Sequence, residues 1–156
     1  MAEHFGSLVG TPSQSSPLTL VDNAYARCPM DVIVRDTIAL AAAPVADTIQ
    51  AAVVGWDTVL DPDDCFLHTS GLGAGVTLSF GAAGFATALD DAVAVNAAGN
   101  VNLCSALGIG SYYQPLWQAL GYASLAAAKA VANQCELLFT LAGAAATGTV
   151  TWRLAG

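Results

Sequence analysis

Most of the chain consists of short apolar and β-branched runs, each closed by residues that favour turns. The run 48–54 ends at Gly55, and the run 76–80 alternates so that Val76, Leu78 and Phe80 share one face. Such alternation is typical of strands that bury one side. Further runs of strand length occupy residues 32–34, 37–40, 65–69, 135–142 and 147–154. We therefore expect about six or seven strands, with Val150, Trp152 and Leu154 facing away from Thr149, Thr151 and Arg153 in the last one.

Three segments between these runs favour short helices: 90–98, 114–121 and 124–133. Asp90 and Asp91 would begin the first, Pro115 lies in the first turn of the second, and Ser124 can cap the third. Helices of this length cannot cross over a parallel sheet. The sequence thus predicts a mainly β fold: an antiparallel β-sandwich or jelly roll with one to three short helices and an extended N-terminal arm.

The N-terminal stretch has a different residue composition. Residues 6–17 are rich in Gly, Ser, Thr, Gln and Pro, and the weak patterning continues to Pro29. We expect residues 1–30 to form the arm and residues 31–156 to form one sandwich domain. The arm is either disordered or becomes ordered on a neighbouring molecule. In the second case its apolar residues would contribute to the interface: Phe5, Leu8, Val9, Leu18, Leu20 and Tyr25.

Charge and composition limit the partners. The chain has twelve acidic residues and only four basic ones, which gives a net charge of −8. Because the basic residues form no cluster, we expect binding neither to nucleic acid nor to an anionic membrane. Hydrophobic residues make up 55% of the chain and charged residues 10%. A surface with so few charges favours association with other subunits. An alanine-rich monomeric domain would have the same composition.

Neither a membrane span nor a signal peptide is expected. The most apolar run, 38–54, is interrupted by Pro44, Asp47 and Gln50, so it falls short of the roughly 20 apolar residues that a spanning helix needs. The first residues lack both a basic and an apolar region. We therefore expect synthesis and folding in a cytoplasm.

Residues that could carry out chemistry are few and poorly spaced. An EF-hand beginning at Asp61 would need Gly and Glu at the positions of Phe66 and Leu72. Cys65 and His68 would project to opposite faces of one strand, so they cannot act as a nucleophile and its base. The cysteines, at positions 28, 65, 104 and 135, are too far apart for a zinc motif and are expected to be free and buried. We predict no catalytic residue, no metal site and no cofactor.

The densest aromatic group is Tyr112, Tyr113 and Trp117, beside Gly108 and Gly110. Such residues anchor interfaces, although they also fill cores. They are our candidate interface residues in the domain.

Two parts of the chain, 46–81 and 114–156, carry a resemblance to a known family. The first contains Asp47-Thr-Ile-Gln, Thr69-Ser-Gly-Leu-Gly and Val76-Thr-Leu-Ser-Phe-Gly, and the second contains Pro115-Leu-Trp-Gln-Ala-Leu-Gly-Tyr and ends on Thr-Gly-Thr-Val-Thr-Trp152. These segments resemble small virion structural proteins of tailed bacteriophages and gene transfer agents. Cys65 and the alanine-rich segment 123–132 depart from that family's pattern.

The resemblance implies a jelly-roll or related sandwich with an N-terminal arm that decorates a capsid or occupies a tail position. It implies a non-enzymatic protein of the virion, made in the cytoplasm of a host bacterium. Its partners would be copies of itself, in a homotrimer, and the major capsid protein or another virion scaffold. One alternative is a tail or fibre module that recognises a host glycan or surface protein through residues 106–117. Another is a small hydrolase with a carboxylate site.

Overall fold

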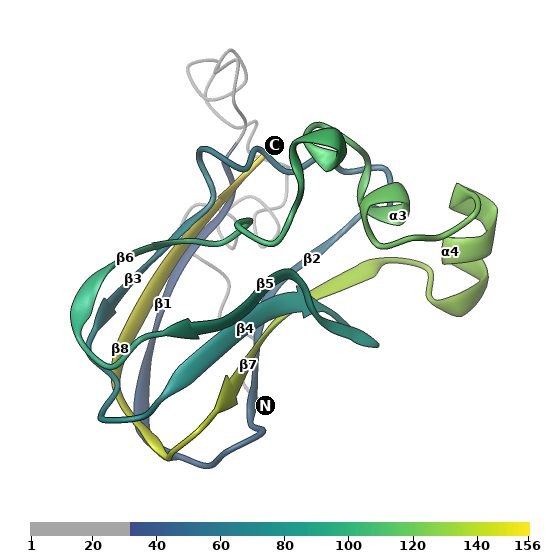
Figure 1. The fold of residues 1–156 in the computed structure, drawn as a ribbon. Helices are drawn as coiled ribbons and strands as arrows, with labels where there is room; N and C mark the ends of the chain where they lie inside the picture. The colour runs from purple at the N-terminus through teal and green to yellow at the C-terminus, as the bar shows by residue number, and fades with distance from the viewer. Residues whose placement is uncertain (1–31) are drawn as a thin grey trace, which may run out of the picture.

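Residues 32–156 are described by the computed structural model, and they form two packed antiparallel sheets of four strands each (Figure 1). The strand order is β1-β8-β3-β6 in the first sheet and β2-β7-β4-β5 in the second. The strands are β1 (Val32–Ala43), β2 (Thr48–Val54), β3 (Phe66–Ser70), β4 (Thr77–Ala82), β5 (Phe85–Ala94), β6 (Ala98–Asn102), β7 (Cys135–Ala142) and β8 (Ala146–Ala155). Between β6 and β7 lie the short helices η1 (Ile109–Ser111), α3 (Leu116–Ala119) and α4 (Leu125–Val131).

The chain crosses from one sheet to the other at nearly every connection. Within residues 32–156, only β4 and β5 follow each other in the same sheet. The first described strand pairs with the last, so that Val32 lies opposite Ala155. This strand order is that of a jelly roll, the eight-stranded sandwich built from two Greek keys. The predicted mainly β, antiparallel sandwich fold is confirmed, and the described part of the chain has eight strands rather than six or seven.

Alternation of side chains explains which face each of the last two strands turns towards the core. In β7 every second residue is buried, from Cys135 through Leu137 and Phe139 to Leu141. In β8 the buried residues Val150, Trp152 and Leu154 alternate with less buried ones, as the sequence predicts. Apolar residues at period two give each strand one inward face, and the two inward faces pack together.

An aromatic chain joins the sheets at the centre of the core. The rings of Phe80 and Phe139, both in the second sheet, lie 5.0 Å apart, and Phe139 lies 5.4 Å from Trp152 of the first sheet. The indole nitrogen of Trp152 donates a hydrogen bond of 3.1 Å to the carbonyl of Ala51 on β2. Trp152 therefore buries its ring between the sheets while its polar N–H keeps a partner.

The expected helix at residues 90–98 is wrong. Asp90 and Asp91 lie within β5, where Asp90 is opposite Phe80 of β4, and residues 98–102 form β6. The register of the β4–β5 pair shifts next to Asp90, and Ala92 has a φ of 48°. The two acidic residues therefore belong to a β-bulge, which inserts an extra residue without leaving the sheet. The backbone groups of this segment form hydrogen bonds with the neighbouring strand β4 instead of forming them within a helix.

The other two helices are confirmed in shortened form. α3 follows Pro115, and the chain turns after it at Gly121, whose φ is 82°. α4 begins after Ser124, whose side-chain oxygen accepts a hydrogen bond of 3.1 Å from the Ala127 amide. Figure 1 shows α4 projecting beyond the end of the sandwich.

Candidate functional site

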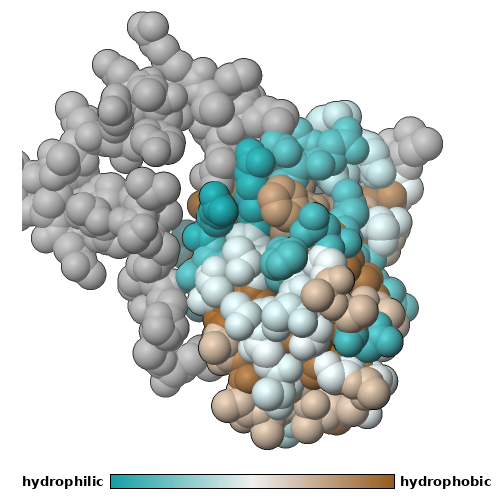
Figure 2. Space-filling model, turned by 90° about the vertical axis from the view of Figure 1, so that its left-hand side faces the viewer, coloured by the Kyte–Doolittle hydropathy of each residue, from teal (hydrophilic) through white to brown (hydrophobic). Residues whose placement is uncertain are grey.

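The first sheet presents a broad, solvent-facing surface built from cross-strand rows of side chains. One row is Arg35, Arg153, Phe66 and Asn102, and the next is Thr37, Thr151, His68 and Asn100. A third row adds Ala39, Thr149, Ser70 and Ala98. We call these twelve residues the outer face. All are exposed except the half-buried Thr151 and Arg153. Figure 2 shows this side of the molecule. Hydrophilic residues gather in its upper part, and neutral to mildly hydrophobic residues lie below them.

Side-chain hydrogen bonds hold the rows in place. The hydroxyls of Thr37 and Thr151 lie 2.9 Å apart, and Nδ1 of His68 lies 2.8 Å from Oδ1 of Asn100. The Ser70 hydroxyl accepts a hydrogen bond of 2.9 Å from the Thr149 amide. These contacts join neighbouring strands, so the outer face is a preorganised surface rather than a set of independent side chains.

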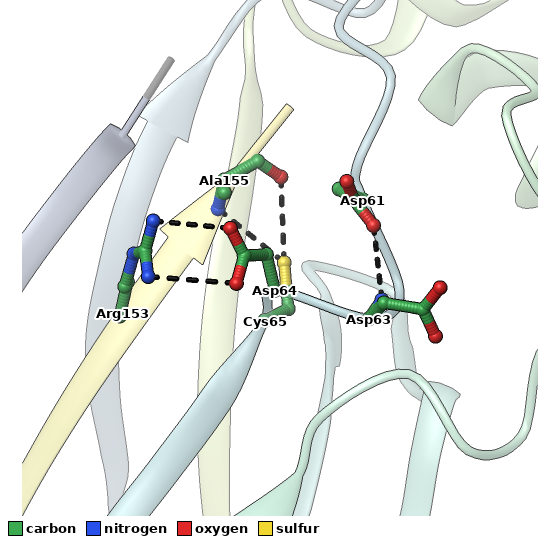
Figure 3. Close-up of polar contacts among 6 residues, drawn as sticks. All are labelled: Asp61, Asp63, Asp64, Cys65, Arg153 and Ala155. Carbon is green, nitrogen blue, oxygen red and sulfur yellow. Dashed lines mark hydrogen bonds and ion pairs between the residues drawn. The ribbon is translucent and has the colours of Figure 1, made fainter. Parts of the chain in front are cut away.

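Arg153 fastens an acidic turn to the edge of this surface (Figure 3). Its guanidinium makes two contacts with the Asp64 carboxylate, at 3.0 and 3.5 Å, and lies 6.0 Å from the centre of the Phe66 ring. The turn itself is closed by the Asp63 amide, which donates to the carboxylate of Asp61 at 3.0 Å. The acidic residues at 61–64 thus act as turn and ion-pair residues. Within residues 32–156, His, Cys, Asp and Glu side chains form no group of three or more that could hold a metal ion.

The three candidate aromatic residues do not form one cluster. The rings of Tyr112 and Tyr113 lie 6.4 Å apart in an edge-to-face arrangement, and Tyr113 is 64% exposed with a φ of 61°. Trp117 instead packs, partly buried, against the core. Its amide donates to the carbonyl of Trp56 at 3.0 Å. Tyr112 and Tyr113 therefore remain candidates for binding, whereas Trp117 mainly anchors α3 to the sandwich.

The remaining interface candidates, Phe5, Leu8, Val9, Leu18, Leu20 and Tyr25, lie outside the described residues, as does the predicted arm 1–30.

A buried carboxyl group lies beneath the β5 bulge. Oδ1 of Asp90 accepts hydrogen bonds from the Ser105 hydroxyl and, at 3.1 Å, from the Asp91 amide. Oδ2 is buried without a hydrogen-bond partner, and burial raises the pKa of Asp90 above its ordinary value of 3.8. Asp90 is only 2% exposed, so substrate has no direct access to it. Asp90, which the sequence pattern placed at the start of a helix, is therefore a core residue in this fold.

Three cysteines are described, and all are free and buried, as expected. Cys135 lies in the second sheet, where burial raises the pKa of its thiol to about 11. Cys65 and Cys104 lie at one end of the first sheet, where the amide of Leu103, the residue before Cys104, donates to the Cys65 carbonyl at 3.1 Å. Each of the two thiols shifts the pKa of the other. Cys65 is buried and His68 is exposed, consistent with the expectation that they face opposite sides. Cys28 lies outside the described residues.

Sequence reasoning did not single out the outer face. Alternation in the run 65–69 was a usable signal, because it directs Phe66 and His68 away from the buried Leu67. Strand order was the missing information, since only the pairing of β3 with β8 brings Phe66 beside Arg153.

No family model, curated protein sequence or solved structure matches this chain. None of the helices within residues 32–156 is long and apolar enough to cross a membrane.

Proposed function

We propose that this chain is a non-enzymatic structural protein of a virion, a capsid decoration subunit that binds the shell. The observation that carries the proposal is the outer face: a preorganised, exposed sheet surface of mainly polar and small side chains, in which Arg35 and Arg153 are the charged residues. A preorganised surface of this kind suits contact with another protein, because its side chains lose little entropy on binding. The resemblance of segments 46–81 and 114–156 to virion proteins supports the same assignment.

The fold supports the proposal by analogy. Jelly rolls occur in viral capsid proteins and in lectins, although a fold by itself does not define a function. The described polar residues also favour a binding role over a catalytic one. His68 is held by Asn100, Arg153 is held by Asp64, and Asp90 is buried.

The test is binding to shells assembled from the major capsid protein of the phage or gene transfer agent that would encode this chain. We expect Ala39→Lys and Ala98→Lys, at opposite edges of the outer face, each to weaken binding about tenfold by placing a charge in the contact. Ala86→Lys is the matched control, because Ala86 is equally an exposed alanine in a strand but belongs to the second sheet. Equal binding by all three variants would contradict a contact through the outer face.

The arm and the stoichiometry are part of the same proposal. We propose that residues 2–29 lie on the shell and that the subunit is a homotrimer. Removing residues 2–29 is expected to abolish binding to the shells, with the sandwich still folded by circular dichroism. Undiminished binding by the shortened chain would exclude the arm from the contact. Native mass spectrometry of the full chain tests the stoichiometry directly, and a monomer at shell-binding concentrations would refute the trimer.

A second candidate function is favoured by Tyr113. An aromatic ring that is 64% exposed beside a second tyrosine suits stacking against a sugar, as in a tail or fibre module that recognises a host glycan. Binding on a glycan array that disappears in Tyr113→Ala, with Tyr122→Phe as the control, would support it. A chain that binds the shells and gives no signal on the array would decide for the decoration role.

A further inference from the structure

Two cysteines lie at the end of the first sheet where β3 begins and where β6 and β8 end. Cys65 precedes β3, and its carbonyl accepts a hydrogen bond of 3.1 Å from the Leu103 amide, which extends the β3–β6 pairing by one residue. Cys104 is the next residue along the chain. Both cysteines are 0% exposed. The two backbones are therefore fixed side by side by a sheet hydrogen bond, at a point 39 positions apart in the sequence (104 − 65).

The two side chains are neighbours in the core, because each thiol shifts the pKa of the other. Sγ of Cys65 also lies 3.4 Å from both the amide nitrogen and the carbonyl oxygen of Ala155 (Figure 3). The contacts with Ala155 hold the Cys65 sulfur in position on the C-terminal strand. Neighbouring cysteines on backbones that a sheet hydrogen bond holds together can reach disulfide geometry by small adjustments.

We propose that Cys65 and Cys104 form a disulfide when the protein meets an oxidising environment, so that this pair is a redox-dependent covalent staple across the end of the first sheet. The staple joins the turn that enters β3 to the loop that leaves β6. This inference rests on the burial of the two cysteines side by side at the end of the sheet, and it holds whether or not the protein decorates a capsid.

The chemistry is thiol–disulfide exchange with a small-molecule disulfide of the glutathione class. The Cys65 thiolate attacks one sulfur of the oxidant, which breaks the oxidant's S–S bond and releases its other half as a thiolate. Cys104 then loses its proton and attacks the Cys65 sulfur of the mixed disulfide. The second half of the oxidant leaves as a thiol, so two electrons and two protons have passed from the cysteine pair to the oxidant.

The thiolate that attacks first is assigned to Cys65. The neighbouring Cys104 side chain lowers the pKa of Cys65, whereas the Cys65 side chain, together with burial, raises the pKa of Cys104. The reverse order of attack would give the same disulfide. Access to the oxidant comes from local opening of the segment after Cys104, where Ser105 and Ala106 are already exposed.

Trypsin separates the relevant cysteines without any mutation. Its cleavage sites at Arg27, Arg35 and Lys129 place Cys65 and Cys104 together in peptide 36–129, while the other two cysteines fall in peptides 28–35 and 130–153. The full chain is equilibrated with reduced or oxidised glutathione, unfolded in the presence of iodoacetamide, and digested without reductant. After oxidation we expect peptide 36–129 to carry no alkyl group and to have lost two hydrogen atoms, while Cys135 remains alkylated.

A stability measurement accompanies the digest. Closing a loop of this length is expected to raise the thermal unfolding midpoint by roughly 5 to 15 °C. The shift should persist in Cys135→Ala, a buried cysteine of the second sheet, and vanish in Cys104→Ala. Two alkyl groups on peptide 36–129 after oxidation, or a link from it to either other cysteine peptide, would overturn the proposal. The digest of the wild-type chain gives this answer even if Cys104→Ala does not fold.

Discussion

Replacing Asp90 by Asn isolates the energetic effect of a buried carboxylate. The substitution keeps the size of the side chain and the oxygen that accepts from Ser105 and from the Asp91 amide. It exchanges the unpartnered Oδ2 for an amide nitrogen, which also lacks a partner but carries no charge. Leaving a buried polar atom unsatisfied costs about 1–3 kcal/mol, and more when the group is charged. We therefore expect Asp90→Asn to raise the free energy of unfolding at neutral pH by about 1–3 kcal/mol.

The pH dependence has a definite sign. Because burial raises the pKa of Asp90 in the folded protein, the folded state holds a proton at this site more readily than the unfolded state does. Stability contributed by this group therefore increases as the pH falls through the raised pKa towards 3.8, and it is lost as the pH rises. The advantage of Asp90→Asn should accordingly be largest at neutral pH and shrink in mild acid, where the wild-type carboxyl becomes neutral.

The assay is urea unfolding followed by tryptophan fluorescence, at neutral pH and in mild acid above the isoelectric point of about 4.1. Asp91→Asn is the matched control, because it removes the charge of the exposed neighbour in the same bulge. We expect the control to change stability by less than about 0.5 kcal/mol. An Asp90→Asn protein that is less stable than wild type at neutral pH, or an advantage that stays constant in acid, would refute the reasoning.

Three further predictions concern local structure and can be measured by the same unfolding assay. Gly143→Ala should destabilise the folded protein by about 1–3 kcal/mol, because Gly143 has a φ of 84° and an added Cβ would overlap the carbonyl of Gly75. Gly84→Ala should reduce the free energy of unfolding by less, because Gly84 has a φ of 83° but no atom near its added Cβ. Trp152→Phe should cost about 1–3 kcal/mol, since it leaves the buried carbonyl of Ala51 without its indole donor, and an unchanged midpoint would contradict this. Ser124→Ala should cost about 1 kcal/mol through loss of the α4 cap, whereas Ser124→Asp should retain most of that stability.

Sequence alone predicted the parts of the fold that depend on local alternation. β7 and β8 were predicted because Leu137, Phe139 and Leu141, and then Val150 and Trp152, repeat at period two. The strands β5 and β6 were missed because their residues are small or polar, as in Ala98-Gly-Asn-Val-Asn. In such segments the pairing partner, rather than intrinsic preference, determines the structure.

The candidate site depended on information that a single sequence does not contain. Tyr112 and Tyr113 could be selected because they are adjacent, and they do pair in the structure. The placement of Cys104 beside Cys65 and the ion pair of Asp64 with Arg153 arise from strand order, which brings together residues far apart in the chain. Local patterns identify which face of a strand is buried, but they do not identify its neighbour.

The position of β8 also has a consequence for biosynthesis. This strand lies between β1 and β3, so the first sheet contains a gap until residues 146–155 have left the ribosome. β1, which is made first among the described strands, must wait for its partner until residues 44–145 and then β8 itself have been made. The sandwich therefore closes late, and nascent chains that stall before β8 expose an unpaired strand to aggregation and to quality control by chaperones.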